Sequence, residues 1–509
     1  MTGPPARQVP DLLLHGASRT PRRPCIVAGA RRITFAEADE RADRLAAALR
    51  AGGVQPGDRV ALLAYNEPEY VEIRVGVHRA GAVFVPLSYR YDDAGLVAVL
   101  ADATPAAVIL GRGMDLPSSA PAVPLVWRLD DDDQQTGYEV VLERARPAAS
   151  PPFIDASAPG AIMYTSGTTG RPKGAVLSHW ALHAGIVAMA HEMAARNDST
   201  YLAAMPLFHI GSQVGYAFTY VGATSVVLPR FKTGPVIDAL RGHGITHTQM
   251  VPTMLNMLLE EGQVTPADAG SLQRIMYGAA PMPPALLRRA MERLGCDFLN
   301  VYGMTEALGI SALRPEEHDP RGRPELLRSV GRDGIGMQTA VVDPDGVPVP
   351  PGTTGEVVVR GPALLDRYHR NEAATAAALQ DGWLRTGDLG HRDDDGYLYL
   401  TDRKDDMIIT GGENVHPSEV ENVLHEHPDV YEAVVVGVPD DRWGSAVCAV
   451  VVPREGVVLD EASLIDFCRA GLPGHKVPKQ VRISATLPRT ASGKVLRRQV
   501  LADLAVGDR

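Results

Sequence analysis

Cysteine is scarce in this chain of 509 residues, and its copies are widely spaced. The four cysteines form no CxxC pair, which argues against a disulfide framework and against a zinc site. No apolar run approaches the roughly 18 residues of a membrane-spanning helix, and the stretch Leu12–Leu14 is too short for the core of a signal peptide. We therefore expect a cytoplasmic protein in a reducing compartment, without a transmembrane segment.

The chain also lacks an excess of basic residues. It carries 50 Lys and Arg against 61 Asp and Glu, a formal net charge of -11, which on average repels a nucleic-acid backbone. We expect no nucleic-acid partner, and any anionic ligand must meet a local group of cations. With 45% hydrophobic and 22% charged residues, the composition is that of a globular protein, and its length predicts two to four domains.

The order of the predicted elements divides the chain into parts. Up to about residue 320, helix-like segments such as 34–51 alternate with strand-like segments such as 58–65, which predicts βαβ units on mostly parallel sheets. From about 321 to 400, short strands between Gly, Pro and Asp turns predict a small antiparallel barrel. A polar connector at 402–406 then leads into an α+β unit.

We therefore predict an α/β fold. Its large N-terminal domain, 1–401, contains doubly wound sheets in two subdomains to about residue 320, plus a small β-barrel at about 321–400. A hinge at 402–406 joins it to a smaller C-terminal α+β domain, 407–509.

The densest motif is a loop rich in glycine and hydroxyl groups. It reads YTSGTTGRPKG from Tyr164 to Gly174 and lies between two strand-like segments. Its glycines permit tight turns, its hydroxyl and N–H groups can surround phosphate oxygens, and Lys173 adds a positive charge. It is not a Walker A sequence, because Pro172 precedes Lys173 and no Ser or Thr follows it. The loop predicts phosphate binding, disfavours P-loop kinases and ATPases, and taken alone has a flexible surface loop as its alternative.

Six further motifs follow this loop in order. They are YGAAP from Tyr277, VYGMTE from Val301, RTGD from Arg385, DRKDD from Asp402, GGEN from Gly411 and PRTASGK from Pro488. In this order and at these spacings, the set resembles the adenylate-forming superfamily of acyl-CoA synthetases, aryl-CoA ligases, firefly-type luciferases and peptide-synthetase adenylation domains. The resemblance covers about residues 30–500, and the chain is most similar to bacterial fatty-acyl or aryl-CoA ligases.

The resemblance implies where ATP binds. It places the phosphates at Thr165, Ser166, Gly167, Thr168, Thr169 and Lys173, the adenine against Gly278, Ala279, Ala280 and Tyr302 beside Gly303 and Met304, and the ribose at Asp388 and Arg403. The small side chains at 278–280 leave room for a flat ring, although a plain strand-to-helix turn is the alternative there. Asp388 alone is more often a turn residue.

Thr305 and Glu306 follow a predicted strand directly and offer a hydroxyl and a carboxylate. This pair suits a phosphate oxygen and a Mg²⁺ ion, which needs oxygen ligands. The resemblance implies catalytic roles for both residues and places Mg²⁺ at Glu306 and Thr165. The alternative from the residues alone is a helix N-terminus with Thr305 as its cap.

Three features remain near the acyl and thiol ends of the implied reaction. The segment 469–498 carries eight Lys and Arg and no acid; most form a solvated basic face, but Lys494 matches the family's catalytic lysine. His209 is a buried structural histidine or, by resemblance, a gate between acyl pocket and thiol channel. The resemblance also implies a mobile C-terminal domain that turns about Asp405 and brings Gly411 and Gly412 to the CoA channel.

These predictions describe an AMP-forming acid–thiol ligase that uses ATP, Mg²⁺ and CoA. A fatty or aryl monocarboxylic acid is expected, because the pocket wall is mostly apolar or small and holds no cation for a second carboxylate. The expected wall is His209, Gln213, Met250, Tyr302, Met304, Ala307 and Gly309. The alternatives are a ligase that loads a carrier-protein phosphopantetheine, one that joins the adenylate to an amine or adenylates another small acid, and a non-catalytic nucleotide-binding module. Both a monomer and a homodimer remain open.

Overall fold

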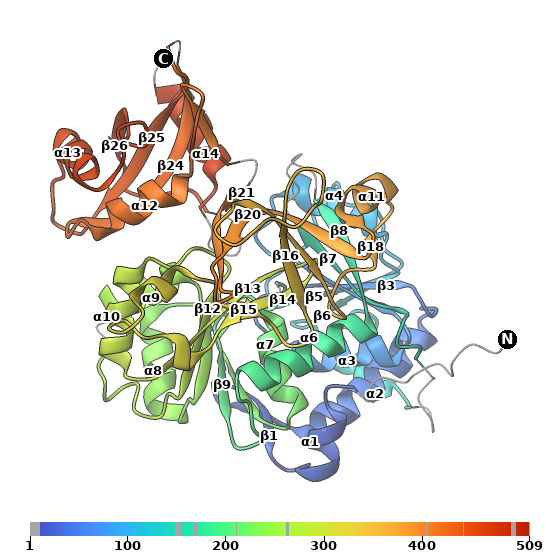
Figure 1. Ribbon diagram of the computed structural model, residues 1–509. Helices are drawn as coiled ribbons and strands as arrows, with labels where there is room; N and C mark the ends of the chain where they lie inside the picture. The colour runs from blue at the N-terminus through green and yellow to red at the C-terminus, as the bar shows by residue number, and fades with distance from the viewer. Residues whose placement is uncertain are drawn as a thin grey trace.

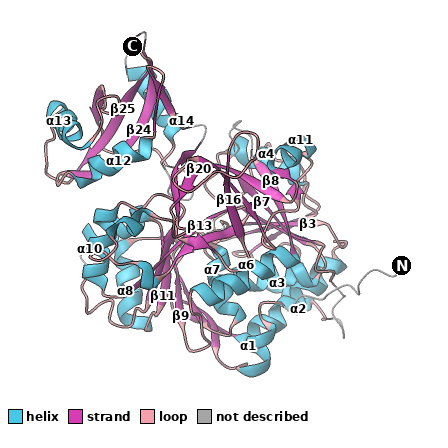
Figure 2. Ribbon diagram, in the orientation of Figure 1, coloured by secondary structure: helices cyan, strands magenta, loops and turns pink. Residues whose placement is uncertain are grey.

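The computed structural model describes residues 11–147, 154–165, 172–209, 211–260, 264–403, 406–440, 442–489 and 495–507. Two large sheets with helices on their faces form most of the N-terminal part, and a smaller unit follows them (Figure 1, Figure 2). None of the described helices combines the length and the apolar character needed to span a bilayer.

The first large sheet carries two of the predicted motifs, those that begin at Tyr277 and Val301. Its strands from β13 to β1 are parallel, and antiparallel pairs complete both edges. In spatial order the strands are β15 (Arg332–Asp333), β14 (Leu308–Leu313), β13 (Asp297–Met304), β12 (Arg274–Gly278), β11 (His247–Met250), β9 (Thr200–Ala203), β10 (Thr224–Val227), β1 (Pro24–Ala28) and β2 (Arg31–Thr34).

The second large sheet is parallel from β7 to β6 and ends in antiparallel pairs at the β18 edge. In spatial order its strands are β18 (Arg367–Tyr368), β8 (Lys173–Ser178), β7 (Pro159–Thr165), β4 (Val83–Leu87), β3 (Arg59–Leu63), β5 (Ala107–Leu110) and β6 (Leu125–Arg128). The glycine-rich loop therefore connects two neighbouring antiparallel strands, β7 and β8.

Helices fill the space between the two sheets and cover their outer faces. The shared core contains side chains of both sheets together with α2, α3, α5, α6 and α7. The helices α8, α9 and α10 cover the other face of the first sheet, and α4 covers that of the second. The N-terminal helices are α1 (Leu14–Arg19), α2 (Phe35–Ala51), α3 (Tyr70–Arg79), α4 (Asp93–Ala103), α5 (Tyr138–Arg144), α6 (His179–Glu192), α7 (Ser212–Tyr220), α8 (Thr233–His243), α9 (Pro252–Glu260) and α10 (Pro284–Leu294).

The start of α2 shows how the sequence determines a helix end. Thr34 accepts the backbone N–H of Glu37 at 3.2 Å, and the Glu37 carboxylate accepts the backbone N–H of Thr34 at 2.7 Å. This capping box satisfies two N–H groups that would otherwise lack a partner. The helix predicted at 34–51 is confirmed.

An antiparallel sheet follows where the small barrel was expected. In the described residues its ladder runs β16 (Gln338–Val342), β17 (Gly355–Arg360), β20 (Trp383–Arg392) and β19 (Leu379–Gln380), with β21 (Leu398–Arg403) paired to β20. The helix α11 (Glu372–Ala378) and the 3-10 turns Pro315–Glu317 and Pro324–Arg328 complete this part.

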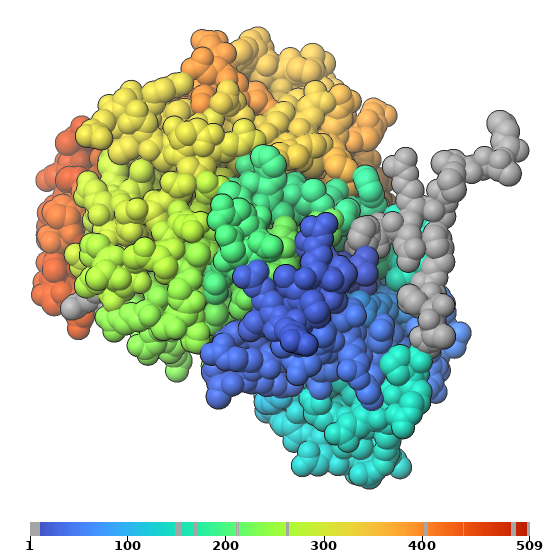
Figure 3. Space-filling model, turned by 90° about the horizontal axis from the view of Figure 1, so that it is seen from below, coloured from blue at the N-terminus to red at the C-terminus, as the bar shows by residue number. Residues whose placement is uncertain are grey.

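The C-terminal unit has its own hydrophobic core and stands at one end of the molecule (Figure 1). Seen from below, it appears at one edge, beyond the segments near residues 200–300 (Figure 3). Its elements are β22 (Ile408–Thr410), β23 (Glu413–Val415), α12 (Pro417–Glu426), β24 (Val430–Asp440), β25 (Gly444–Pro453), α13 (Glu461–Gly471), β26 (Gln480–Ile483) and α14 (Arg497–Gly507). The prediction of an α/β fold with a large N-terminal and a smaller C-terminal part is confirmed.

Polar side chains connect the C-terminal unit to the rest. Arg454 pairs with Glu260 at 2.6 Å, and Arg489 donates to the hydroxyl of Thr253 at 3.2 Å. Each hydrophobic cluster of the described residues lies wholly on one side of this boundary. Such a contact resembles the polar interfaces across which domains move.

Candidate active site

The motifs at 278 and 301 meet at one edge of the first sheet. β12 and β13 are parallel neighbours, with Gly278 opposite Val301, so their carboxyl ends lie side by side. A Cβ on Gly278 would come within 2.3 Å of the Val301 carbonyl oxygen, and Ala279 has φ of 66°, a left-handed conformation that is unusual for a side chain. The close approach of the two strands therefore requires glycine at position 278, whatever ligand lies against it.

Thr305 and Glu306 lie in the turn between β13 and β14. The turn is tight, because Ala307 donates its N–H to the Met304 carbonyl at 3.1 Å, and a Cβ on Gly303 would lie 1.8 Å from the Leu308 carbonyl oxygen. Thr305 and Glu306 are both buried. The alternative of a helix N-terminus is wrong: the chain forms a hairpin here, since antiparallel β14 follows within four residues of β13.

Tyr302 links this edge to the antiparallel sheet. Its hydroxyl donates to Oδ2 of Asp388 at 2.5 Å, and both residues are buried. The backbone N–H of Asp388 donates to the hydroxyl of Thr386 at 3.1 Å. Asp388 is paired in register with Arg403, of which only the backbone is described. The structure thus brings together two residues that the resemblance assigns to adenine and ribose.

Lys173, Glu306 and a residue that the sequence did not indicate, Tyr368, form a second cluster. The Tyr368 hydroxyl donates to Oε1 of Glu306 at 2.9 Å, and the Lys173 ammonium lies 5.6 Å from the centre of the Tyr368 ring. The short strand β18 carries Tyr368 to the edge of β8, where it pairs with Ala175. A two-residue strand has no recognisable sequence pattern, so no signal in the sequence could have placed Tyr368 here.

The ends of the glycine-rich loop are paired. Thr165 stands opposite Lys173 in the β7–β8 ladder, and its hydroxyl donates to the Lys173 carbonyl at 3.4 Å. The predicted phosphate-binding residues Ser166, Gly167, Thr168 and Thr169 lie outside the described residues, as does Lys494. The pairing of β7 with β8 therefore positions both ends of this loop, and Lys173, at its second end, contacts the same Tyr368 as Glu306.

His209 lies in the segment between β9 and α7. Its backbone N–H donates to the Pro206 carbonyl at 3.4 Å, and its ring is 6.4 Å from that of Phe208. Nearby, the buried amides of Gln213 and Gln249 have side-chain oxygens without a hydrogen-bond partner in the part of the chain that the structure describes. A buried amide normally has a partner, so this region suits a donor from a water or a bound molecule.

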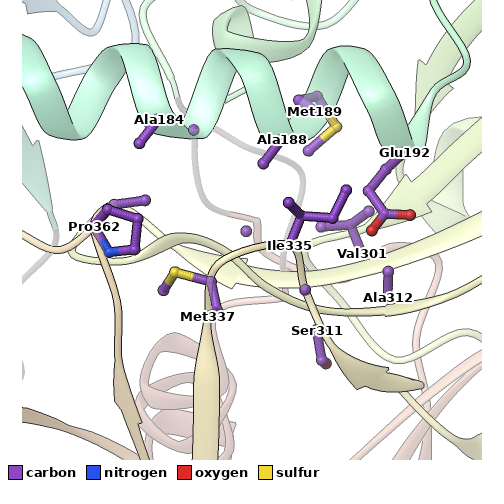
Figure 4. Close-up of a pocket in the computed structure, with 14 residues that line it drawn as sticks. Ala184, Ala188, Met189, Glu192, Val301, Ser311, Ala312, Ile335, Met337 and Pro362 are labelled. Carbon is purple, nitrogen blue, oxygen red and sulfur yellow. The ribbon is translucent and has the colours of Figure 1, made fainter.

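A small cavity lies between α6 and the β13–β14 ladder (Figure 4). Ala188 and Met189 of α6 face Val301 and Ile335 across it, and Gly309 of the predicted pocket wall lines it. Its volume of about 20 Å³ holds a single water molecule and no ring. An acid with a bulky group can enter here only after side chains move.

The glycines of the GGEN motif lie in the C-terminal unit. Gly411 donates its N–H to the Trp443 carbonyl at 2.9 Å, and a Cβ on Gly411 would lie 2.8 Å from the Trp443 ring. Gly411 and Gly412 have φ of 59° and 86°, conformations that favour glycine. Within the described residues, no hydrogen bond or ion pair joins this loop to Tyr302 or Glu306.

Known proteins match the chain over nearly its whole length. Indoleacetate–CoA ligase of Aromatoleum aromaticum is 38% identical, over 92% of this chain and 93% of its own. The fatty acid–[acyl-carrier-protein] ligase ScoC of Streptomyces coeruleorubidus is 36% identical, over 97% and 95%. These relatives confirm the predicted class of acid–thiol ligase.

Solved structures also match the fold over nearly the whole chain. The o-succinylbenzoate CoA synthetase MenE of Bacillus subtilis, in complex with its acyl-adenylate intermediate, superposes with a TM-score of 0.86 at 32% identity and covers 97% of this chain and 98% of that one. The amide bond synthetase McbA of Marinactinospora thermotolerans has a TM-score of 0.89 at 32% identity, covering 97% and 99%.

Two family profiles match the chain. The profile of the AMP-binding enzymes covers residues 13–369, and that of the AMP-binding enzyme C-terminal domain covers residues 419–494. Together with the relatives, they confirm the resemblance that the seven motifs indicated. The chain belongs to the AMP-binding enzymes, within the adenylate-forming superfamily.

Proposed function

We propose that this enzyme activates a carboxylic acid with ATP to an acyl-AMP and transfers the acyl group to the thiol of CoA. The observation that carries the proposal is the meeting of two clusters at the carboxyl end of β13: Tyr302 bonded to Asp388, and Glu306 bonded to Tyr368 beside Lys173. The first cluster suits a nucleoside and the second suits its charged phosphates. The relatives that join acids to thiols support the second half of the reaction.

In the first step, the acid's carboxylate attacks the α-phosphorus of ATP, and pyrophosphate leaves. A carboxylate is a poor acyl donor because oxide would have to leave; the mixed anhydride supplies AMP as the leaving group instead. We assign Lys173 to the phosphates on the β7–β8 loop, and Lys494 to the carboxylate and α-phosphate, where the developing negative charge is stabilised by fixed cations. The Asp388 carboxylate holds the ribose hydroxyls as their acceptor.

The residues at the turn fit Mg²⁺. Glu306 is a buried carboxylate whose Oε2 has no hydrogen-bond partner among the described residues, and Thr165 adds a hydroxyl; these are the oxygen ligands that the ion prefers. A bound Mg²⁺ would neutralise phosphate charge. Glu306 and Thr165 would hold it.

In the second step, we propose that the C-terminal domain turns about Asp405, which lies outside the described residues. This turn would withdraw Lys494 and present Gly411 and Gly412 to the pantetheine arm. The polar boundary supports such a movement: Arg454 and Glu260 are 27% and 34% exposed, and partly exposed ion pairs contribute at most about 1 kcal/mol. His209, on the loop before α7, would gate the thiol channel.

Two other acceptors remain as candidates, each favoured by a specific relative. A carrier-protein phosphopantetheine is the acceptor named for ScoC, and McbA is named as an amide bond synthetase. Both chemistries share the adenylation step and differ only in the nucleophile that attacks the acyl-AMP.

One screen tests all three. Pyrophosphate release is measured with fatty acids of graded length and with aryl acids, first without an acceptor and then with CoA, with a carrier protein in its phosphopantetheine form, or with a primary amine. We expect turnover with a monocarboxylic acid and CoA. Faster turnover with the carrier protein or with the amine would show that this molecule, and not CoA, is the acceptor. The absence of pyrophosphate release with every acid would refute the proposed function.

A further inference from the structure

Tyr368 contacts two oppositely charged side chains of the site. Its hydroxyl donates to Oε1 of Glu306 at 2.9 Å, and its ring lies 5.6 Å from the ammonium of Lys173. Within the described part of the chain, neither Lys173 nor Glu306 has an ion-pair partner, although both belong to one cluster. Two opposite charges in a partly buried site would be expected to pair directly.

We propose that Tyr368 is a positioning residue that keeps the Glu306 carboxylate apart from the Lys173 ammonium. The inference rests on the proposed function, in which Lys173 meets ATP phosphates and Glu306 meets Mg²⁺. A direct Lys173–Glu306 pair would neutralise both groups before the nucleotide arrives. Tyr368 instead gives each group a weaker contact, a hydrogen bond to Glu306 and a ring contact to Lys173, and a bound nucleotide with its metal can displace both.

The two contacts use different parts of one side chain. The phenolic O–H gives the carboxylate a hydrogen bond to a charged acceptor, and the ring face attracts the ammonium through its quadrupole. A Phe at this position would keep the ring and lose the O–H. The O–H is therefore the group that holds Glu306 in place, and it can be removed without removing the packing.

The backbone around Tyr368 is fixed to both partners. In the β18–β8 ladder, Tyr368 pairs with Ala175, two residues beyond Lys173. Three residues before Tyr368, Leu365 donates its N–H to the backbone carbonyl of Glu306 at 2.7 Å. The segment thus joins the strand of Lys173 to the turn of Glu306, and Tyr368 is held between them at 9% exposure.

The test measures ATP binding by calorimetry in EDTA, without acid or CoA. Tyr368→Phe should weaken metal-free ATP binding about tenfold, the lower end of what a hydrogen bond to a charged group contributes, because Lys173 then pairs with Glu306. In a Glu306→Gln background, the same Tyr368→Phe change should have no effect, since no carboxylate is left to capture Lys173. AMP, which lacks the β- and γ-phosphates, should bind Tyr368→Phe and wild type alike.

Tyr302→Phe is the matched control. It also removes the hydroxyl of a buried Tyr bonded to a carboxylate, but on the nucleoside side, so it should weaken AMP and ATP to the same degree in both backgrounds. Melting temperatures of all variants show whether the fold is intact.

Two results overturn the proposal. One is a wild-type affinity for metal-free ATP in Tyr368→Phe. The other is an equal loss in the wild-type and Glu306→Gln backgrounds, which is what a purely structural Tyr368 would produce. A protein that binds both nucleotides but releases no pyrophosphate with any acid refutes the proposed function while leaving this binding test readable.

Discussion

Replacing Asp388 by Ala tests the nucleoside end of the site. Asp388 is 8% exposed, and it accepts the hydroxyl of Tyr302 at 2.5 Å. Its N–H is bonded to Thr386, whose own hydroxyl donates to the Val357 carbonyl at 2.7 Å. The carboxylate is therefore held in one orientation before any ligand binds, so little ordering is left for the nucleotide to cause.

The expected loss follows from the kind of contact. A hydrogen bond to a buried charged acceptor contributes about 1.5 to 3 kcal/mol, and at about 1.4 kcal/mol for each tenfold change the ATP affinity should fall about 10- to 150-fold. AMP should lose the same factor, because the two nucleotides share the ribose. Asp388→Asn keeps the shape and removes the charge, and should fall between the wild type and Asp388→Ala.

Calorimetric titration of ATP and AMP into each protein measures these losses. A double-mutant cycle with Tyr302→Phe separates the loss of the ribose contact from the loss of the Tyr302–Asp388 bond, since neighbouring residues are coupled. An Asp388→Ala protein that melts like the wild type and binds both nucleotides with unchanged affinity would show that Asp388 serves only its turn, and the nucleoside site would have to lie elsewhere.

Three further predictions concern catalysis and stability. Lys494→Ala should abolish pyrophosphate release yet leave thioester formation from supplied acyl-AMP largely intact, and equal loss of both half-reactions would contradict its assignment. Asp405→Pro fixes φ near -65°, so in separate half-reaction assays it should slow transfer to CoA far more than adenylation. Transfer at the wild-type rate would show either that the pivot lies at another residue or that the domains do not alternate. Burial lowers the pKa of His179 and of His247 to about 4, below the unfolded value near 6.5, so the unfolded chain binds more protons. Above about pH 7.5 the stabilising contribution of each neutral histidine should be complete, and as the pH falls from 7.5 to 5 the free energy of unfolding should decrease by about 2 kcal/mol for each of them. Urea unfolding at several pH values measures this decrease. His247→Gln should remove the share of His247, and a flat profile would contradict the burial argument.

The sequence predicts those parts of the molecule whose determinants are local. The helix in segment 34–51, which begins at a capping box, and the alternation of strands and helices depend on residues within a few positions of one another. It could not distinguish a helix N-terminus from a hairpin at Thr305 and Glu306, because a hydroxyl followed by a carboxylate suits both. The partner strand decided between them: β14 pairs with β13 through a shifted register at Tyr302 and Gly303.

Contacts between distant segments could not be predicted in the same way. Tyr368 reaches Glu306 through a strand of two residues, too short for any periodic pattern. The sequence also could not show the surroundings of two buried amides. Gln213 was expected in a mostly apolar pocket wall, but in the structure the side-chain oxygens of Gln213 and Gln249 both lack a hydrogen-bond partner within the described residues. The basic segment at 469–498 was expected to be mostly a solvated face, but some of its cations form ion pairs: Arg489 contacts Glu432, and Lys476 contacts Glu419.

The ladder between β20 and β21 limits where a turning C-terminal domain can bend. Asp388 pairs with Arg403, the last residue of β21, and Ile408 is already paired with Val415 in the β22–β23 hairpin. Rotation on either side of this interval would have to break strand pairs, and on the β21 side the first pair to break is the one that holds Asp388. A rotation that breaks the pairing of Arg403 would therefore displace Asp388, and with it the proposed contact to the ribose, so an over-rotated domain would be expected to release AMP.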